Sequence, residues 1–300
     1  MIARIGRYVA GSYPPIMSVL FAMAWTYGVS GLFAVVDHQG PSHWRPNMGT
    51  ALSAITLMLD LLLMRVIDDI RDLEYDRVHD PKRPLVRGVV RISDLAVLYA
   101  VLSAIIVVLN WKHAGLGIIA GQLVYALIVL FVYQRFRWPN GDNLLLTLLV
   151  SCPAQLLVHG YLYAGYLQAA GHSADAYGFL AIAIVFIATI HLEAAKKIVR
   201  IPRPGERTYV NIFGLDGTVR IAMLCPFVSV ALLLVGAASP WSVARLLLVL
   251  APLALPLVAF REFRRPNERW PAKYAALYVL SAFGAFACTG AFAGGLGGGR

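Results

Sequence analysis

Residues 51–76 read ALSAITLMLDLLLMRVIDDIRDLEYD, an apolar run that ends in a series of aspartates. A helix needs roughly 20 apolar residues to cross a bilayer. The run therefore predicts a membrane-spanning helix at about 49–69, with its aspartates where the helix leaves the lipid. Backbone groups in hydrocarbon must be satisfied within helices or closed barrels, and nothing in the sequence alternates with the two-residue period of a barrel strand. The chain is therefore predicted to be all-α.

Eight further apolar runs have a similar length, and the composition of the whole chain fits a membrane protein. Of the 300 residues, 59% are hydrophobic and only 14% are charged, which is too little charge for a water-soluble surface. We predict a polytopic membrane bundle of about nine transmembrane helices, built as one domain over residues 1–300, with cap loops at about 70–92 and 198–218 and a flexible glycine-rich end at 294–300. The further spans are expected at about 15–36, 93–110, 115–134, 143–163, 177–197, 219–237, 243–260 and 273–293.

Basic residues are distributed unevenly over the predicted connections. Of the 26 Lys and Arg residues, only Arg45, Lys112, Arg245 and Arg300 lie outside the N-terminus, the even-numbered connections and the adjoining helix ends. Because cytoplasmic connections of membrane proteins are enriched in Lys and Arg, we expect an integral, multi-pass protein of the plasma (inner) membrane with a cytoplasmic N-terminus and an external C-terminus. The net charge of +10 does not indicate nucleic-acid binding, because the basic residues lie between apolar runs rather than on one soluble face.

The aspartates after the second span form a pattern that suits a metal ion. At about 100° per residue, Asp69, Asp72 and Asp76 project from one helical face, where like charges repel unless a cation joins them. Carboxylate oxygens at a polar rim suit Mg²⁺, which shares its coordination shell with substrate phosphates. Asp68 points away from this face and joins it only if the helix distorts, whereas Arg65 lies one turn before Asp69 on the same face. The alternative is a solvated helix end of mixed charge.

This segment resembles the first aspartate-rich motif of the UbiA-type intramembrane prenyltransferase superfamily. The family pattern Asn-Asp-x-x-Asp-x-x-x-Asp is followed by Arg-Pro-Leu, which is Arg83-Pro84-Leu85 here, and only the asparagine is replaced, by Asp68. The resemblance extends over the whole chain, because the number of spans and the position of the motif on the second span also agree. It implies that Asp69, Asp72 and Asp76 are catalytic and that Mg²⁺ is the cofactor. The expected metal ligands are Asp68, Asp69, Asp72 and Asp76, and the expected diphosphate contacts of this segment are Arg65, Lys82 and Arg83.

The family's second aspartate-rich stretch is altered in this sequence. Its three acidic positions are occupied by Glu193, Lys196 and Arg200. One carboxylate among cations cannot hold a second divalent metal in the usual way, so either the cations contact the diphosphate directly or the site is remodelled for another substrate. A third reading is an ordinary helix pair between Glu193 and Lys197. In the first reading Glu193 is catalytic, and the diphosphate contacts are Lys196, Lys197 and Arg200, with Tyr133 and Arg137 added by the family resemblance.

The resemblance implies a Mg²⁺-dependent membrane prenyltransferase, which ionises an isoprenoid diphosphate and transfers the prenyl group to an acceptor, typically an aromatic one. Because the second motif is altered, a membrane terpene cyclase that needs no acceptor is an alternative, and a non-catalytic lipid-binding or transport protein is a third. The expected partners are a prenyl diphosphate, a lipophilic or aromatic acceptor and membrane lipid, and the oligomeric state is left open. Asp60 lies deep in the second span, so it is a further functional candidate or it pairs with a hydroxyl or histidine in the bundle.

Overall fold

The computed structural model describes residues 1–40 and 44–293, and this part of the chain is helical without any β-strand. It contains nine helical segments that are long and apolar enough to cross a membrane, which confirms the predicted all-α polytopic bundle. The predicted flexible end at 294–300 lies outside the described residues. The segments are α2 (Pro15–Val36), α3 (Met48–Arg71), α5 (Ile92–Leu109), α6 (Leu116–Phe136), α7 (Leu144–Ala170), α8 (Ala176–Ala195), α9 (Val210–Gly236), the run of α10 (Val243–Leu250), η1 (Ala251–Leu253) and α11 (Ala254–Phe263), and α12 (Ala272–Ala293).

Two shorter helices lie outside these segments, and the predicted cap loops are partly helical. α1 (Ile2–Ser12) precedes the first span, and α4 (Leu73–His79) lies inside the predicted loop 70–92. The other predicted loop, 198–218, is shorter in the structure because α9 already begins at Val210. Within α9, Gly214 has a left-handed φ of 69°, a conformation that glycine adopts without steric strain. Helical turns therefore join across a kink where the sequence suggests an open loop.

The chain divides into two compact units. The first unit contains residues 1–23 and 51–165, and the second contains residues 24–50 and the chain from Tyr166 onward. Each unit is therefore assembled from segments that are distant in the sequence.

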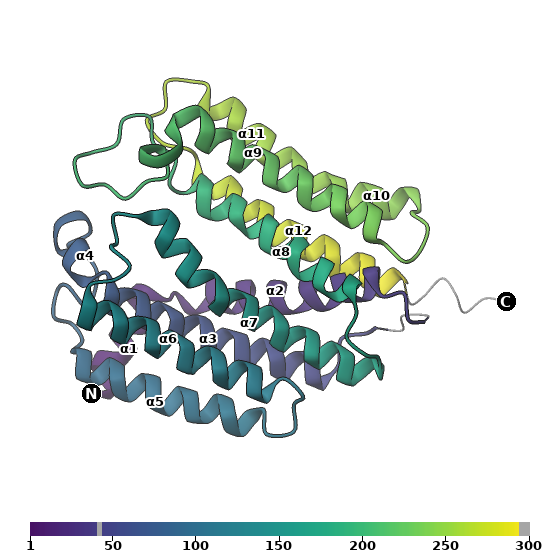
Figure 1. Ribbon diagram of the computed structural model, residues 1–300, viewed down its shortest axis with the longest axis horizontal. Helices are drawn as coiled ribbons and strands as arrows, with labels where there is room; N and C mark the ends of the chain where they lie inside the picture. Colours follow the sequence, from purple (N-terminus) through teal and green to yellow (C-terminus); the bar gives the residue numbers. More distant parts are fainter. Residues whose placement is uncertain (41–43, 294–300) are drawn as a thin grey trace. The chain divides into compact units, whose positions relative to one another are not determined.

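In the first unit, α3, α5, α6 and α7 run alongside one another (Figure 1) and are joined by buried hydrogen bonds. The hydroxyl of Tyr99 on α5 donates to the carbonyl of Leu123 on α6 at 2.8 Å. Asn110, just after α5, donates to the hydroxyl of Thr56 on α3 at 2.8 Å and accepts from the hydroxyl of Tyr161 on α7 at 2.7 Å. Polar bonds of this kind help to hold helices together in lipid, where apolar burial adds little.

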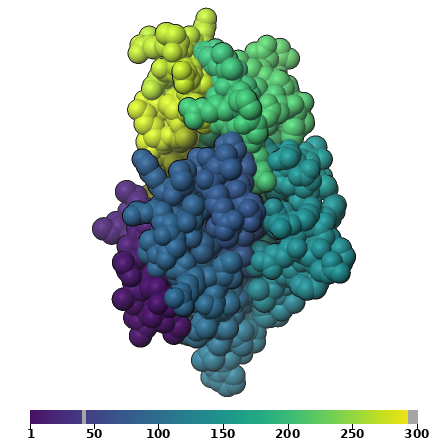
Figure 2. Space-filling model, turned by 90° about the vertical axis from the view of Figure 1, so that its left-hand side faces the viewer, coloured from purple at the N-terminus to yellow at the C-terminus, as the bar shows by residue number. Residues whose placement is uncertain are grey.

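The N-terminal helix α1 packs against α5 in the same unit. Its contact is an ion pair in which Arg4 donates to both carboxylate oxygens of Asp94, from Nε at 2.7 Å and from Nη2 at 2.8 Å. Figure 2 shows this N-terminal segment in purple beside the blue surface of the first unit. The bidentate geometry adds specificity as well as strength, so α1 is fixed at the end of α5 that carries Asp94.

The second unit contains a close contact between α2 and α12 that depends on glycines. A Cβ built on Gly290 would lie 2.4 Å from the carbonyl oxygen of Gly31, and one built on Gly31 would lie 2.7 Å from the Cα of Ala287. A Cβ on Gly28 would lie 2.7 Å from the backbone of Phe283. Small residues at such positions let helix backbones approach closely, a common way of packing helices in membranes.

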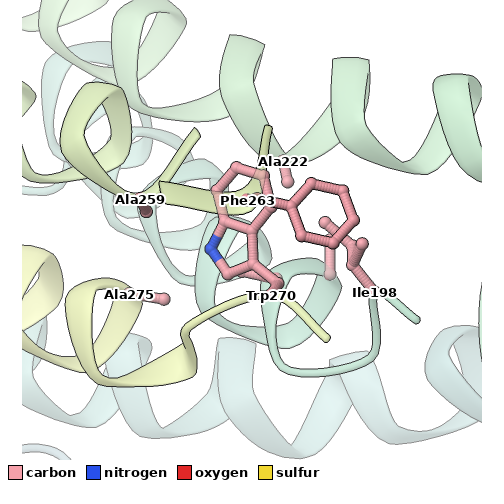
Figure 3. Close-up of a cluster of buried hydrophobic side chains, with 8 residues drawn as sticks. Ile198, Ala222, Ala259, Phe263, Trp270 and Ala275 are labelled. Carbon is pink, nitrogen blue, oxygen red and sulfur yellow. The ribbon is translucent and has the colours of Figure 1, made fainter. Parts of the chain in front are cut away.

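The same unit joins the connection after α8 to the connection after α11. Trp270 donates its backbone N–H to the carbonyl of Ile198 at 3.1 Å, and its indole packs against the ring of Phe263 with centroids 5.4 Å apart. Figure 3 shows these rings with Ile198, and with Ala222 and Ala259 from neighbouring helices, as one buried apolar cluster. The two connections are therefore anchored to the bundle rather than free of it.

Candidate active site

Asp69 is the centre of a buried ionic cluster at the end of α3 in the first unit. The residue is only 1% exposed, and its carboxylate accepts bonds on both oxygens. Oδ1 lies 3.1 Å from Nη2 of Arg65 and 2.7 Å from Nη1 of Arg83. Oδ2 accepts a hydrogen bond from the hydroxyl of Tyr8 at 2.9 Å. A carboxylate this deeply buried is stable only with such partners, and here it has three.

Arg83 brings a second aspartate to the same cluster. Its Nε lies 3.2 Å from Oδ2 of Asp76 and 3.1 Å from Oδ2 of Asp80, while its Nη1 contacts Asp69. Burial by itself lowers the pKa of Arg83, but the charges of Asp76 and Asp69 outweigh that effect and raise it overall. Arg83 therefore stays charged between two carboxylates that the structure places on either side of it.

The pKa of Asp76 reflects first its burial and then the charges around it. Burial raises its pKa to about 6, and the charges of Asp72, Asp69 and Asp80 add to this rise while Arg83 opposes it. Like charges held together disfavour ionisation of one member of the group. Two arginines, Arg65 and Arg83, thus face three carboxylates and compensate them only in part, so the cluster offers an incoming cation a favourable position.

Asp72 and Asp68 both form ion pairs with Arg71. α3 ends at Arg71, and Asp72 has φ −92° and ψ 10° between α3 and α4. The Nη2 atom of Arg71 lies 3.0 Å from Oδ2 of Asp72 and 2.9 Å from Oδ1 of Asp68. The ion pairs therefore group Asp68 with Asp72 around Arg71, and Asp69 with Asp76 around Arg83, where the regular helix predicts Asp69, Asp72 and Asp76 on one face.

Three other predicted diphosphate contacts lie on the surface of the first unit or close to it. Lys82 is exposed next to Arg83, and Tyr133 is half-buried in the last turn of α6. Arg137 is exposed and ends α6 with a left-handed φ of 54°, where its backbone N–H donates to the carbonyl of Tyr133 at 2.8 Å. Their contact with a diphosphate stays a prediction.

In the second unit, Glu193 lies at the end of α8 with both predicted lysines around it. Lys196 forms an ion pair with Oε2 of Glu193, and the Nζ atom of Lys197 lies 3.1 Å from Oε1. The hydroxyl of Tyr209 donates to the same Oε1 at 3.5 Å, and its ring lies under Lys197 with the Nζ atom 5.4 Å from the centroid. The helix pair between Glu193 and Lys197 exists, and the proposed contact of these cations with a diphosphate stays a prediction.

Arg200, the third cation of the altered motif, bonds to backbone carbonyls. Its guanidinium donates to the carbonyls of Phe263, Arg265 and Asn267, and it stacks over the ring of Phe263 at 4.4 Å. These bonds join the connection after α8 to the one after α11. Arg200 thus has a structural role that the sequence motif does not suggest. Its contact with a diphosphate stays a prediction.

The donor set around Arg83 fits a magnesium ion shared with a substrate. Among the described residues, no group of three or more His, Cys, Asp or Glu side chains is arranged as a metal site. Mg²⁺, however, is usually bound by one or two carboxylates with water and substrate phosphates completing its shell. Asp69 Oδ1 and Asp76 Oδ2 flank the same guanidinium, so a cation between them would replace the charge that Arg83 now supplies.

Tyr8 is a site residue that the sequence pattern does not reveal. It is fully buried, and burial, followed by the charge of Asp69, raises the pKa of its hydroxyl, so Tyr8 stays a protonated donor. The local signal is an amphipathic pattern in Ile2–Ser12, with Arg4 and Tyr8 one turn apart. That pattern predicts a helix but gives no indication that the helix reaches the aspartates.

The model of the UbiA prenyltransferase family matches residues 23–287. This range contains the aspartates of α3 and α4, Arg83 and the altered second motif, but not Tyr8. Neither a curated protein nor a solved structure matches the chain.

Proposed function

Because the matching range covers most of its length, the chain belongs to the UbiA prenyltransferase family, and we propose that it is a Mg²⁺-dependent enzyme that transfers the prenyl group of an isoprenoid diphosphate to a lipophilic or aromatic acceptor. It is an integral membrane protein, with nine apolar helices among the residues that the structure describes. That the protein binds Mg²⁺, a prenyl diphosphate and an acceptor is part of this proposal.

The observation that carries this proposal is the pair of buried carboxylates on either side of Arg83. Asp69 and Asp76 are 1% and 3% exposed, and together with Asp80 they carry more negative charge than Arg65 and Arg83 compensate. Asp69 and Asp76 would hold Mg²⁺, which would supply positive charge to a bound diphosphate. A purely structural ion pair would need one carboxylate for Arg83, which here contacts three.

Each part of the cluster has a role in the proposed reaction. The C–O bond of the prenyl diphosphate breaks with its electron pair going to the diphosphate, and the acceptor forms the new bond and gives up a proton. Bound Mg²⁺ would stabilise the negative charge that builds up on the leaving group. Arg65 and Arg83 carry N–H groups that suit phosphate oxygens, and both arginines lie beside Asp69. The apolar helices exclude water from the reacting carbon.

We also propose that the end of the first unit that carries this cluster faces the cytoplasm. The connections there contain Arg83, Arg87 and Arg91, and the neighbouring N-terminal helix contains Arg4 and Arg7. Such an excess of basic residues is typical of cytoplasmic segments. A cytoplasmic site would also meet water-soluble Mg²⁺ and prenyl diphosphates directly.

The proposal is tested with detergent-purified protein, Mg²⁺, and a panel of prenyl diphosphates with and without aromatic acceptors, with products identified by mass. We expect a prenylated acceptor and released diphosphate, and no product when EDTA removes Mg²⁺. Asp76→Asn should lower the rate on the order of 100-fold or more, as losses of charge stabilisation do. Glu74→Gln is the matched control, because Glu74 is on the same helix but exposed and paired only with Arg77 among the ion pairs of α4.

Three results would overturn the proposal. Product formation that continues in EDTA would exclude a role for the metal. A wild-type rate for a folded Asp76→Asn variant would exclude the aspartate pair. A cyclised hydrocarbon or alcohol formed from the diphosphate alone would replace acceptor transfer by terpene cyclisation, with the same cluster as the ionising site.

A further inference from the structure

The hydroxyl of Tyr8 contacts Asp69, a proposed metal ligand, on the carboxylate oxygen that the arginines do not contact. It donates to Oδ2 of Asp69 at 2.9 Å, while both arginines contact Oδ1. Oδ1 is therefore the oxygen directed toward Arg83 and, beyond it, toward Asp76. Because a carboxylate is planar and rotates about one bond, a donor fixed on Oδ2 also fixes where Oδ1 points.

Tyr8 can fix Asp69 because α1 is itself held firmly. The side chain of Tyr8 is fully buried, and one turn earlier Arg4 makes its two bonds to Asp94 of α5. The next turn of α1 approaches the segment that carries Arg83, since a Cβ on Gly11 would lie 2.9 Å from the side chain of Pro84. The N-terminal helix therefore lies against the cluster at more than one point.

We propose that Tyr8 is a positioning residue for metal binding, which holds Oδ1 of Asp69 toward Asp76 without itself occupying that oxygen. The inference rests on the proposed function, since it assumes that Asp69 is a metal ligand. Tyr8 does not itself contact the reacting groups in this account; it acts through Asp69.

A neutral donor is suited to this task for an electrostatic reason. Arg65 and Arg83 neutralise Asp69, but as cations they compete with Mg²⁺ for the same oxygen. A phenol adds no charge, so its bond to Oδ2 is compatible with a cation at Oδ1. Removal of a group that orients a metal ligand in this way commonly lowers metal affinity by about 10- to 100-fold.

The test compares Tyr8→Phe with Tyr99→Phe, using Mn²⁺ as an oxygen-preferring substitute for Mg²⁺. Tyr99 is the matched control, because its buried hydroxyl in the same unit makes a 2.8 Å bond to the carbonyl of Leu123 and contacts neither Asp69 nor Asp76. The fraction of Mn²⁺ bound to the purified protein, with inorganic pyrophosphate present, is measured by electron paramagnetic resonance. The melting temperature of each variant is recorded without metal.

We expect Tyr8→Phe to raise the dissociation constant for Mn²⁺ about 10-fold, whereas Tyr99→Phe leaves it unchanged. In turnover, the Mg²⁺ concentration for half-maximal rate should rise for Tyr8→Phe, and saturating Mg²⁺ should restore most of kcat. A general loss of packing would lower the melting temperature without this selective change in metal dependence.

The outcomes separate this inference from the proposed function. If the wild-type protein binds Mn²⁺ and Tyr8→Phe binds it equally well, the positioning role is wrong and the proposed function stands. If the wild-type protein binds no Mn²⁺ with pyrophosphate present, the metal assignment falls, and the inference falls with it. If Tyr99→Phe weakens binding as much as Tyr8→Phe, the effect is not specific to Asp69 and the inference is overturned.

Discussion

Asp69 and Asp76 share the guanidinium of Arg83, with Nη1 at 2.7 Å from one carboxylate and Nε at 3.2 Å from the other. Both aspartates are almost fully buried. Two carboxylates held this close together in a buried place repel each other strongly unless a cation lies between them. In this structure that cation is Arg83, which comes from the connection between α4 and α5.

Replacement of Arg83 should therefore make the stability of the protein depend on divalent metal. We expect Arg83→Gln to lower the free energy of unfolding by about 1–3 kcal/mol, less than the full cost of breaking a buried pair because Arg83 is one quarter exposed. Added Mg²⁺ should then raise the melting temperature more in the variant than in the wild type, since a ligand of the folded state stabilises it by mass action. Thermal unfolding in detergent, with and without Mg²⁺, measures both effects.

Arg77→Gln serves as the control, because Arg77 is 57% exposed and pairs with Glu74 at 3.3 Å on the surface of α4. Exposed pairs of this kind contribute little, so this variant should melt like the wild type in both conditions. An equal Mg²⁺-induced shift in Arg83→Gln and the wild type would show that Arg83 and the metal do not compete for the same carboxylates.

The length and apolarity of the spans could be predicted from the sequence because both are local properties. Each run from Pro15 to Ala293 that crosses the membrane carries its own signal, and most helices lie close to the expected bounds, whereas α7 ends later than expected, at Ala170, and α9 begins earlier, at Val210. The site could be predicted only in part. Helical periodicity places Asp69 and Asp76 near each other, but it does not reveal that Asp72 pairs with Arg71 while Asp69 and Asp76 pair with Arg83.

Contacts made by residues far apart in the chain could not be predicted from local patterns. Tyr8 reaches Asp69 only because α1 packs against α5, and nothing in residues 2–12 specifies that docking. Similarly, the register of Arg200 with the altered motif suggests a phosphate contact, whereas its guanidinium joins two connections through the carbonyls of Phe263, Arg265 and Asn267. Both relationships belong to tertiary packing, which one sequence does not reveal.

Asp60 should tolerate loss of its charge, although it lies deep in the second span. It is fully buried, and neither oxygen has a hydrogen-bond partner within bonding distance among the described residues, although the amide of Gln122 is close enough to interact with it. Burying an unpaired carboxylate is costly. We expect Asp60→Asn to keep enzymatic activity and to raise the free energy of unfolding by about 1 kcal/mol, measured as an increase in melting temperature.

Asn110 in the same unit differs from Asp60 in having hydrogen-bond partners, because its side chain bonds to Thr56, Ile106 and Tyr161. Asn110→Leu should lower the free energy of unfolding by about 1–3 kcal/mol through the partners it leaves unpaired. If Asp60→Asn instead abolished activity in a folded protein, Asp60 would have to act in the reaction, and its burial would need another explanation.

Asp37 should make the stability of the second unit sensitive to acid. Its Oδ2 lies 2.6 Å from the hydroxyl of Tyr166 and 2.6 Å from Nδ1 of His172, and its Oδ1 accepts from the backbone N–H of Gln39 at 2.9 Å. Burial alone raises the pKa of Asp37, but these hydrogen bonds outweigh it and lower the pKa below its usual value of 3.8. A lowered pKa stabilises the folded state above the unfolded value, and this contribution is lost as the pH falls through the folded value.

Asp37→Asn should therefore lower the free energy of unfolding by about 1–3 kcal/mol at pH 7. The difference from the wild type should stay constant down to about pH 5 and shrink below the usual pKa of a carboxyl. Thermal unfolding from pH 7 to pH 3 measures it, with the exposed Glu74→Gln as a control that should show no such difference. A gap that widened with acid would contradict the assignment of these bonds to the ionised carboxylate.

The contact between α2 and α12 gives the sharpest prediction for stability, because backbone atoms cannot move aside as side chains do. In Gly290→Ala the new Cβ would lie 2.4 Å from the carbonyl oxygen of Gly31 and 2.6 Å from its Cα. Contacts this short force the two helices apart, so we expect a loss of about 1–3 kcal/mol, the usual cost of overpacking. On the same helix, Gly284→Ala meets nothing within 4 Å and should gain up to about 1 kcal/mol, because alanine favours helix more than glycine does. Melting temperatures of the two variants should therefore move in opposite directions. Two equal, small shifts would mean that α2 and α12 do not approach each other closely in the folded protein.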